Sequence, residues 1–318
     1  MPAGLIDTHS HLDCPAFDKD RAELVHEART AGVTDILVCA GFPAGFEAAR
    51  SAAHTYGLHY AAGIHPLFLP EEEETEAALT ALKDFLSAHA DDPRLAAVGE
   101  IGLDGYIETP TVAEQLPVFA AQLKLAAEFD LPVSIHARHA VDAVSAAIRK
   151  SGVRRGVINA FNGSSEQAKR LIDLGFKLGF GGALMYTGSK RIRRIFAEIG
   201  DTDFVLETDA PDMPSPGRRA DADSRTHPAD IALYPVMLKY LRFHTAVSAD
   251  YKGEQYIQLG RLYATYSNTA AGVTEVEATD TRAAVSPNPV ASGSTFTVKS
   301  NGITAITVYS CLLYTSPS

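Results

Sequence analysis

The stretch LIDTHSHLD, residues 5–13, predicts both a strand of the fold and the position of its chemistry. Apolar residues lead into Asp7, His9 and His11, and side chains two positions apart in an extended strand point to the same side. Both imidazoles can therefore reach a single ion. Two histidines with a nearby carboxylate form a ligand set for zinc or a first-row transition metal. The stretch predicts a strand that ends in a metal site.

Short apolar segments of the same kind recur along the chain, separated by longer amphipathic stretches. The predicted strands are 5–8, 35–39, 60–64, 95–101, 133–136, 156–159, 177–180 and 204–208, with helices expected at 113–129, 166–174 and 190–199. The polar residues 162–165 and Gly32 supply helix start and stop signals. Eight strand and helix repeats favour an α/β fold of the TIM type, a closed (β/α)₈ barrel.

Composition narrows the class of protein. The 318 residues are 46% hydrophobic and carry a formal net charge of -11, so the surface lacks the basic footprint of a stable nucleic-acid binder. The three cysteines show no paired spacing, and neither a signal sequence nor an apolar run of membrane-spanning length is present. We expect a cytoplasmic protein without membrane association or a stable protein partner.

The character of the chain changes near its end. Residues 1–271 are expected to form the barrel domain, and 272–318 to form a linker and a short β-like tail. The alternating stretch 294–310 predicts a β-hairpin around Asn301 and Gly302, whereas CLLYTSPS, residues 311–318, fits no pattern. The segment 285–298 resembles the start of bacterial C-terminal sorting domains, so we expect a truncated sorting domain or a chimeric tail without a catalytic role.

The polar residues that follow the predicted strands carry the chemistry. The carboxyl ends of parallel barrel strands meet at one open face. Besides Asp7, His9 and His11, the residues at these ends are His65, Glu100, His136, Asn159 and Asp209. The two oxygens of Glu100 can bridge two ions, and His136 can supply nitrogen to the second. Asp209 can ligate an ion and accept a proton from an activated water, so the set predicts a hydrolase.

For some of these positions we retain a structural role, instead of a role in catalysis, as the interpretation. A single polar residue at a strand end is most often a hydrogen-bonded structural group, and this is favoured for Asp7, Asp104 and His65 taken alone. His65 and Arg138 are nevertheless the candidates for binding a substrate phosphate, since Arg138 follows the fifth strand and can form two parallel hydrogen bonds.

The motifs together resemble the TatD-like metal-dependent hydrolases of the amidohydrolase superfamily. The resemblance covers residues 4–270 and rests on DTHSHLD, GIHP, AVGEIGLD, PVSIHARHA, INAFNGS, GFGGALMY and LETDAPDMP. It implies a barrel phosphoesterase with two divalent ions (Zn, Mn or Mg), some members being DNases. It also implies that His9, His11, Glu100 and Asp209 hold the first ion, and Glu100 and His136 the second. Asp209 would orient or deprotonate the attacking water, making Asp209 and Glu100 the catalytic pair.

One position departs from the family. The family commonly has histidine where this chain has Asn159, and a neutral amide is a weaker ligand than imidazole. Either Asn159 is a weak ligand and the second ion binds loosely, or Asn159 only hydrogen-bonds loop backbone.

The sequence leaves three functions open. The first is a phosphodiesterase or DNase acting on nucleic acid or related phosphoesters. The second is an amidohydrolase acting on a C–N bond, because the same activated water suits either electrophile. The third is a catalytically idle barrel that serves as a binding module.

Overall fold

The computed structural model describes residues 4–234 and, further along the chain, five short strands. The chain divides into two compact units, Met1–Leu238 and Lys239–Ser318. The predicted domain boundary after residue 271 lies outside the described residues and stays a prediction.

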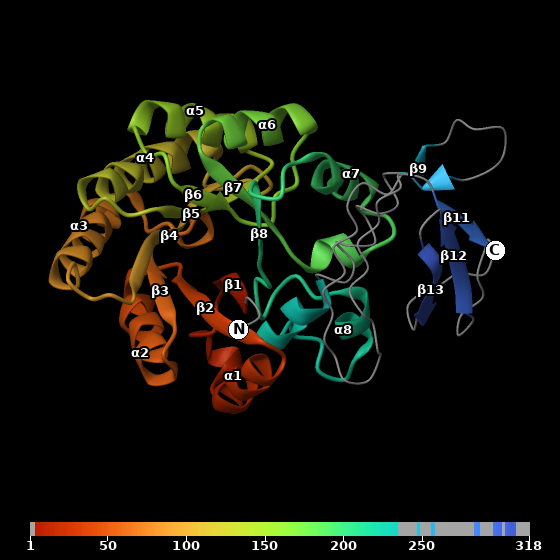
Figure 1. Cartoon of the computed structure of the whole chain (residues 1–318). Coiled ribbons are helices and arrows are strands. Elements are labelled where there is room, and N and C mark those ends of the chain that lie inside the picture. The colour runs from red at the N-terminus through yellow and green to blue at the C-terminus, as the bar shows by residue number, and fades with distance from the viewer. Residues whose placement is uncertain are drawn as a thin grey trace. The chain divides into compact units, whose positions relative to one another are not determined.

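The first unit is built on eight parallel strands in sequential order (Figure 1). The strands are β1 Leu5–Ser10, β2 Val33–Ala40, β3 His59–Ala62, β4 Leu95–Asp104, β5 Val133–Arg138, β6 Gly156–Ile158, β7 Phe176–Phe180 and β8 Phe204–Leu206. All eight predicted strands are therefore confirmed, with ends that differ by a few residues. Long apolar runs identified them because both faces of such strands are buried, as in β4.

The barrel closes where the first and last strands meet. Ser10 forms a parallel bridge with Ala210, just beyond the end of β8. The backbone N–H of Asp209 donates to the His9 carbonyl at 2.9 Å, and that of His11 donates to the Ala210 carbonyl at 2.7 Å. These contacts join β1 to the segment after β8, so the predicted TIM-type fold is confirmed.

A helix follows each of the first seven strands. The α-helices are α1 Arg21–Thr30, α2 Phe46–Tyr56, α3 Glu72–Ala88, α4 Val112–Glu128, α5 Val141–Ser151, α6 Ser165–Asp173, α7 Lys190–Glu198 and α8 Pro216–Ala220. Short 3₁₀ helices lie at η1 Pro15–Phe17, η2 Pro43–Gly45, η3 Pro66–Phe68, η4 Gly182–Met185 and η5 Pro228–Leu233. The predicted start and stop signals of the helices are confirmed. Ser164 caps the start of α6 with its side chain, and Gly32 follows the end of α1 at a φ of 93°.

Close packing between β4 and β5 fixes the position of Glu100. Gly102 has a φ of 147°, and a Cβ atom there would lie 2.0 Å from the carbonyl oxygen of His136. Only glycine allows the two strands to approach this closely. This packing holds Glu100 on the inside of the barrel mouth, where the residue is only 2% exposed.

The second unit contains a five-stranded antiparallel sheet in the order β13-β12-β11-β10-β9. Its strands are β9 Val247–Ser248, β10 Tyr256–Ile257, β11 Ala283–Ser286, β12 Thr295–Ser300 and β13 Ile303–Tyr309. β12 and β13 pair as the predicted hairpin, with Ser300 opposite Ile303. The expected linker contains β11, whose short Ala-Ala-Val-Ser run pairs with β10 on one side and with β12 on the other. Residues 311–318 lie outside the described part of the chain. Among the described residues, none of the helices combines the length and the apolar character of a membrane span.

Candidate metal centre

Four predicted ligands meet at the mouth of the barrel. The Nε2 atoms of His9 and His11 lie 3.3 Å apart. Glu100 Oε2 lies 3.3 Å from His9 Nε2 and 3.4 Å from His11 Nε2. Asp209 Oδ1 is 3.5 Å from each of these nitrogens. Side chains from three strand ends therefore converge on one small volume.

The spacing of these atoms fits a metal ion. Ligands about 2.1 Å from one ion at tetrahedral angles lie roughly 3.4 Å apart, against roughly 3.0 Å for neighbouring octahedral ligands. The five separations of 3.3 to 3.5 Å match the tetrahedral value. Two nitrogens and two carboxylate oxygens in this arrangement suit zinc best among the three candidate metals.

Hydrogen bonds on the outer side of each ring support this assignment. His11 Nδ1 donates to the Cys39 carbonyl at 2.8 Å, and His9 Nδ1 lies 2.9 Å from Ser134 Oγ. A ring that carries its proton on Nδ1 has a lone pair on Nε2, which is the atom facing the cluster. Sequence analysis missed Ser134, although its position two residues before His136 indicated the same face of β5.

The second predicted group surrounds the other oxygen of Glu100. His136 Nδ1 lies 3.4 Å from Glu100 Oε1, and His65 Nε2 lies 3.6 Å from the same atom. These three residues satisfy the distances of a metal-binding group. Glu100 can therefore bridge two ions through its two oxygens, as the sequence predicts.

The two histidines of this group differ in which nitrogen is free. His136 Nε2 lies 2.9 Å from Asp104 Oδ2, so a ring that gives up one proton when a metal ion binds would direct the lone pair of Nδ1 toward Glu100. His65 Nδ1 instead accepts from the backbone N–H of Leu67 at 3.1 Å. Neutral His65 therefore carries its proton on Nε2 and turns an N–H toward Glu100. The distance from His65 to Glu100 is that of a metal ligand. The hydrogen bond from Leu67 nevertheless leaves His65 Nε2 as a donor, which agrees with binding substrate rather than metal.

Asn159 completes the ring around Glu100 Oε1. Its amide Nδ2 donates to Glu100 Oε1 at 3.0 Å rather than to loop backbone. Asn159 Oδ1 is buried and has no hydrogen-bond partner among the described residues. An unused buried acceptor in this position fits a cation, so the residues present suit a second ion that Asn159 would hold only weakly.

The structure assigns clear roles to the two aspartates for which the structural interpretation was favoured. Asp7 is buried and accepts from the Thr208 backbone N–H at 2.9 Å, which ties β1 to the end of β8. Asp104 holds His136 with one oxygen and accepts from the Tyr106 backbone N–H at 2.7 Å with the other. Asp7 is a structural group as expected, whereas Asp104 also orients a predicted metal ligand.

Electrostatics in the mouth follow from burial and from the shared carboxylate. Burial lowers the pKa of His65 to about 4, so this ring is neutral near pH 7. Burial acts in the same direction on His136, but hydrogen bonds to Asp104 and Glu100 outweigh it and raise its pKa to about 9. Burial likewise opposes ionisation of Glu100, yet the surrounding histidines keep its pKa well below the usual range. The mouth therefore stabilises negative charge on Glu100.

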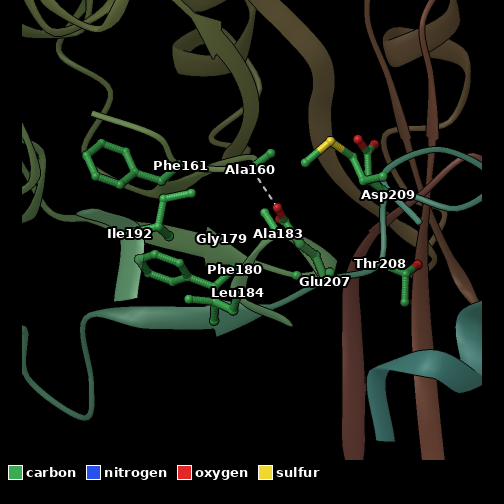
Figure 2. Close-up of a pocket in the computed structure, with 13 residues that line it drawn as sticks. Ala160, Phe161, Gly179, Phe180, Ala183, Leu184, Ile192, Glu207, Thr208 and Asp209 are labelled. Atoms are coloured by element: carbon green, nitrogen blue, oxygen red, sulfur yellow. Dashed lines mark hydrogen bonds between the residues drawn. The ribbon is translucent and has the colours of Figure 1, made fainter. Parts of the chain in front are cut away.

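Glu207 is a buried carboxyl group beside the centre that sequence analysis did not single out. Figure 2 shows it reaching toward Ala160, whose backbone N–H donates to Oε1. Oε2 has no partner within the described part of the chain and lines a cavity of about 10 Å³, the space of one water. Burial raises the pKa of Glu207 to about 8. The LETD sequence gave a signal, because Glu207 and Asp209 are two positions apart.

A larger cavity extends from the metal centre across the mouth. It has a volume of about 930 Å³, and its lining includes His136, Asn159, Asp209, Arg138 and Arg191. Arg138 lies at the mouth as predicted, but its guanidinium carbon rests 3.7 Å from the centroid of the Tyr106 ring. This volume is suited to a substrate much larger than a single phosphate group.

Fold and ligand set together define a metal-dependent hydrolase. The family model described as TatD related DNase matches residues 6–244. The chain belongs to the TatD related DNase family.

Individual relatives agree with this family. An uncharacterized metal-dependent hydrolase of Escherichia coli, YjjV, is 37% identical over 68% of this chain and 83% of its own length. The 3'-5' ssDNA/RNA exonuclease TatD of Klebsiella pneumoniae is 30% identical over 79% of this chain and 91% of its own. The crystal structure of the E. coli YjjV protein superposes with a TM-score of 0.69 at 34% identity, covering 74% of this chain and 90% of that one.

Proposed function

We propose that this protein is a phosphodiesterase of the nuclease type that cleaves nucleic acid or related phosphoesters. The observation that carries the proposal is the set of four donor atoms from His9, His11, Glu100 and Asp209 at tetrahedral spacing. The Klebsiella relative described as a 3'-5' ssDNA/RNA exonuclease supports a nucleic-acid substrate.

Asp209 and Glu100 are the proposed catalytic residues. A divalent ion bound here would activate water and polarise a phosphoryl oxygen. Asp209 is the more accessible carboxylate, with 17% of its side chain exposed against 2% for Glu100. Asp209 therefore orients the attacking water and accepts its proton at a carboxylate oxygen. Glu100 accepts a hydrogen bond from Asn159 on Oε1 and directs Oε2 toward His9 and His11, so it keeps the ligands in place.

The proposed cofactors are two divalent ions of unequal affinity. His9, His11, Glu100 and Asp209 hold the first, and Glu100 with His136 holds the second. Asn159 replaces a stronger imidazole at this second position, so its ion binds weakly. Zinc best suits the tetrahedral first set of two nitrogens and two oxygens, and manganese and magnesium remain the alternatives that metal analysis would distinguish.

His65 and Arg138 are the proposed substrate-binding residues. His65 carries its proton on Nε2, 3.6 Å from Glu100 Oε1, and Arg138 lines the same cavity as His136 and Asp209. Each can donate to a phosphoryl oxygen. A cytoplasmic location completes the proposal, and the free thiols of Cys14 and Cys39 agree with a reducing compartment.

An assay with purified protein tests this function. Single-stranded DNA, a small phosphodiester and a cyclic amide are each incubated with manganese, zinc or magnesium, with and without chelator. We expect cleavage of DNA and of the phosphodiester, lost with chelator and restored by metal. Hydrolysis of the cyclic amide alone would identify an amidohydrolase, and no hydrolysis under any condition would identify an idle barrel. Either result would refute the proposal.

A further inference from the structure

We infer that two exposed aromatic groups on the rim of the mouth bind the unstacked bases of a single nucleic-acid strand. The first group is Tyr106 with Arg138, and the second is Phe42 with Phe68. The inference deepens the proposed function, on which it rests, by naming the surfaces that would select single strands.

Exposed apolar side chains concentrate at the mouth. In the described part of the chain, eight large hydrophobic side chains are exposed, and five of them follow the carboxyl end of a strand within a few residues. These five are Phe42, Leu67, Phe68, Tyr106 and Met213. Exposed apolar surface that gathers in one place indicates a binding surface, since water would otherwise favour its burial.

Tyr106 is exposed and yet firmly held. Its side chain is 62% exposed, while its backbone N–H is fixed by Asp104, which also orients His136. Gly105 donates its N–H to the Arg138 carbonyl at 2.7 Å, and a Cβ at Gly105 would lie 2.8 Å from the His139 carbonyl oxygen. The loop after β4 therefore packs tightly on the end of β5. This packing places Arg138 over one face of Tyr106 and gives the pair a rigid, planar surface.

The second aromatic group lies on the loops after β2 and β3. The rings of Phe42 and Phe68 are 5.3 Å apart between centroids and are 41% and 54% exposed. Phe68 belongs to η3, one residue after Leu67, whose backbone N–H fixes the His65 ring. The structure therefore positions this pair together with a predicted substrate-binding residue.

The two groups are joined through the metal centre. Phe68 lies 5.8 Å from the ring of His65, and His65 lies 4.5 Å from the ring of His136. Arg138 follows His136 by two residues on β5. These contacts place one aromatic group beside His65 and the other beside His136, so a strand with one phosphate at the centre can reach both.

Charge favours a base-binding surface over a purely electrostatic one. The chain has a formal net charge of -11, which repels a polyanion at long range. Stacking of a base on an aromatic ring does not depend on net charge and is available to single strands, whose bases can unstack. In a duplex the bases already stack on one another, so these surfaces select single strands.

Binding measured without catalysis tests the inference separately from the proposed function. A labelled oligothymidylate and an abasic oligonucleotide of equal length carry the same phosphates and differ only in their bases. Their dissociation constants are measured by fluorescence anisotropy in chelator, where cleavage cannot occur. We expect the oligothymidylate to bind about tenfold more tightly, because each stacked base contributes to affinity.

Variants assign this preference to the named rings. Phe68→Ala and Tyr106→Ala should each reduce the preference about threefold or more, whereas Phe68→Tyr and Tyr106→Phe should retain it. Ile6→Thr, which alters an exposed apolar side chain on β1 outside the rim, should leave it unchanged. Equal affinity for both oligonucleotides in the wild type, or equal loss of both in the alanine variants, would overturn the inference. Cleavage with added metal is scored separately and tests only the proposed function.

Discussion

The two ends of the barrel use buried polar groups differently. At the carboxyl ends of the strands, Asn159 Oδ1 and Glu207 Oε2 lack hydrogen-bond partners in the described part of the chain. Asp209 and Ala160 adopt left-handed backbone conformations there, with φ of 60° and 44°. At the amino ends, the carboxylate of Asp92 accepts from His54 Nε2 at 2.7 Å and from the Tyr60 hydroxyl at 3.0 Å. The amino-terminal end surrounds the Asp92 carboxylate with donors, while the mouth leaves buried acceptor oxygens without partners and so ready for ligands.

This difference indicates a division between stability and function. A carboxylate surrounded by donors lowers the free energy of the folded state, whereas unpartnered groups raise it unless a ligand binds. Substitutions at the amino-terminal end should therefore change stability and leave activity intact. Substitutions at the mouth should have the opposite effect.

The largest expected effect is on activity, from Asp209→Asn. The amide cannot accept the proton of the attacking water, so we predict that kcat falls about a thousandfold. The same change removes a negative charge beside Glu100, so metal-free protein should unfold at the same temperature as wild type or higher. Steady-state kinetics and thermal unfolding in chelator measure the two effects. A kcat within tenfold of wild type would contradict the assignment.

The next effect is on stability, from Asp92→Asn at the opposite end. Burial alone raises the pKa of Asp92, but hydrogen bonds from His54, the Arg94 backbone and Tyr60 outweigh it and lower the pKa to about 2. We predict a loss of roughly 2 kcal/mol in the free energy of unfolding at pH 7, with kcat unchanged. Denaturant titration measures this loss. An Asp92→Asn variant that is as stable as wild type but has a lower kcat would contradict the proposed division between stability and function.

The pH dependence of the same variant gives a more specific check. Because the folded-state pKa of Asp92 lies below its usual value of 3.8, its contribution is complete above about pH 4. It disappears as the pH falls through the folded-state value near 2. The stability difference between wild type and Asp92→Asn should therefore shrink over this window, whereas a difference independent of pH would point to lost packing.

A smaller effect should follow from Asn159→His at the mouth. An imidazole here adds a strong ligand to the group around Glu100 Oε1, so affinity for the second ion should rise about tenfold or more. Metal content per chain after dialysis at graded metal concentrations measures it. Asn162→His, which lines the same cavity without the contact to Glu100, is the matched control. Equal metal content in both variants would argue against a second ion at this position.

The smallest effect is expected from Tyr60→Phe. Tyr60 is fully buried, and its hydroxyl supplies one of several donors to Asp92. Removing this donor leaves the other partners in place, so we predict a loss of about 1 kcal/mol in unfolding free energy. A loss larger than that of Asp92→Asn would show that the Tyr60 hydroxyl stabilises this end through a contact other than its hydrogen bond to the carboxylate.

Much of the fold could be predicted because parallel barrel strands are buried on both faces. Their apolar runs are visible in sequence, and the rule that strand ends converge brought His9, His11, Glu100 and Asp209 into one predicted group. The structure places these four together. Local sequence was sufficient to predict those features that depend on a single strand or a single helix cap.

Contacts between strands could not be predicted in the same way. The hydrogen bond of Ser134 to His9 depends on how β5 is registered against its neighbours, and that of Asn159 to Glu100 joins residues far apart in sequence. The strand β11 was expected to be linker because a run of four residues carries little signal without its partner strands β10 and β12. Such features arise from tertiary packing, which overrides local preference.

The seam of the barrel has a consequence for how the protein acquires its metal. His9 and Asp209 come from opposite ends of the barrel sequence and are joined by a backbone hydrogen bond across the closure. A nascent chain therefore holds only three of the four ligands of the first set until residue 209 has been synthesised. The first ion can therefore bind its complete ligand set only after the barrel has closed. An ion bound there would connect the first strand to the last.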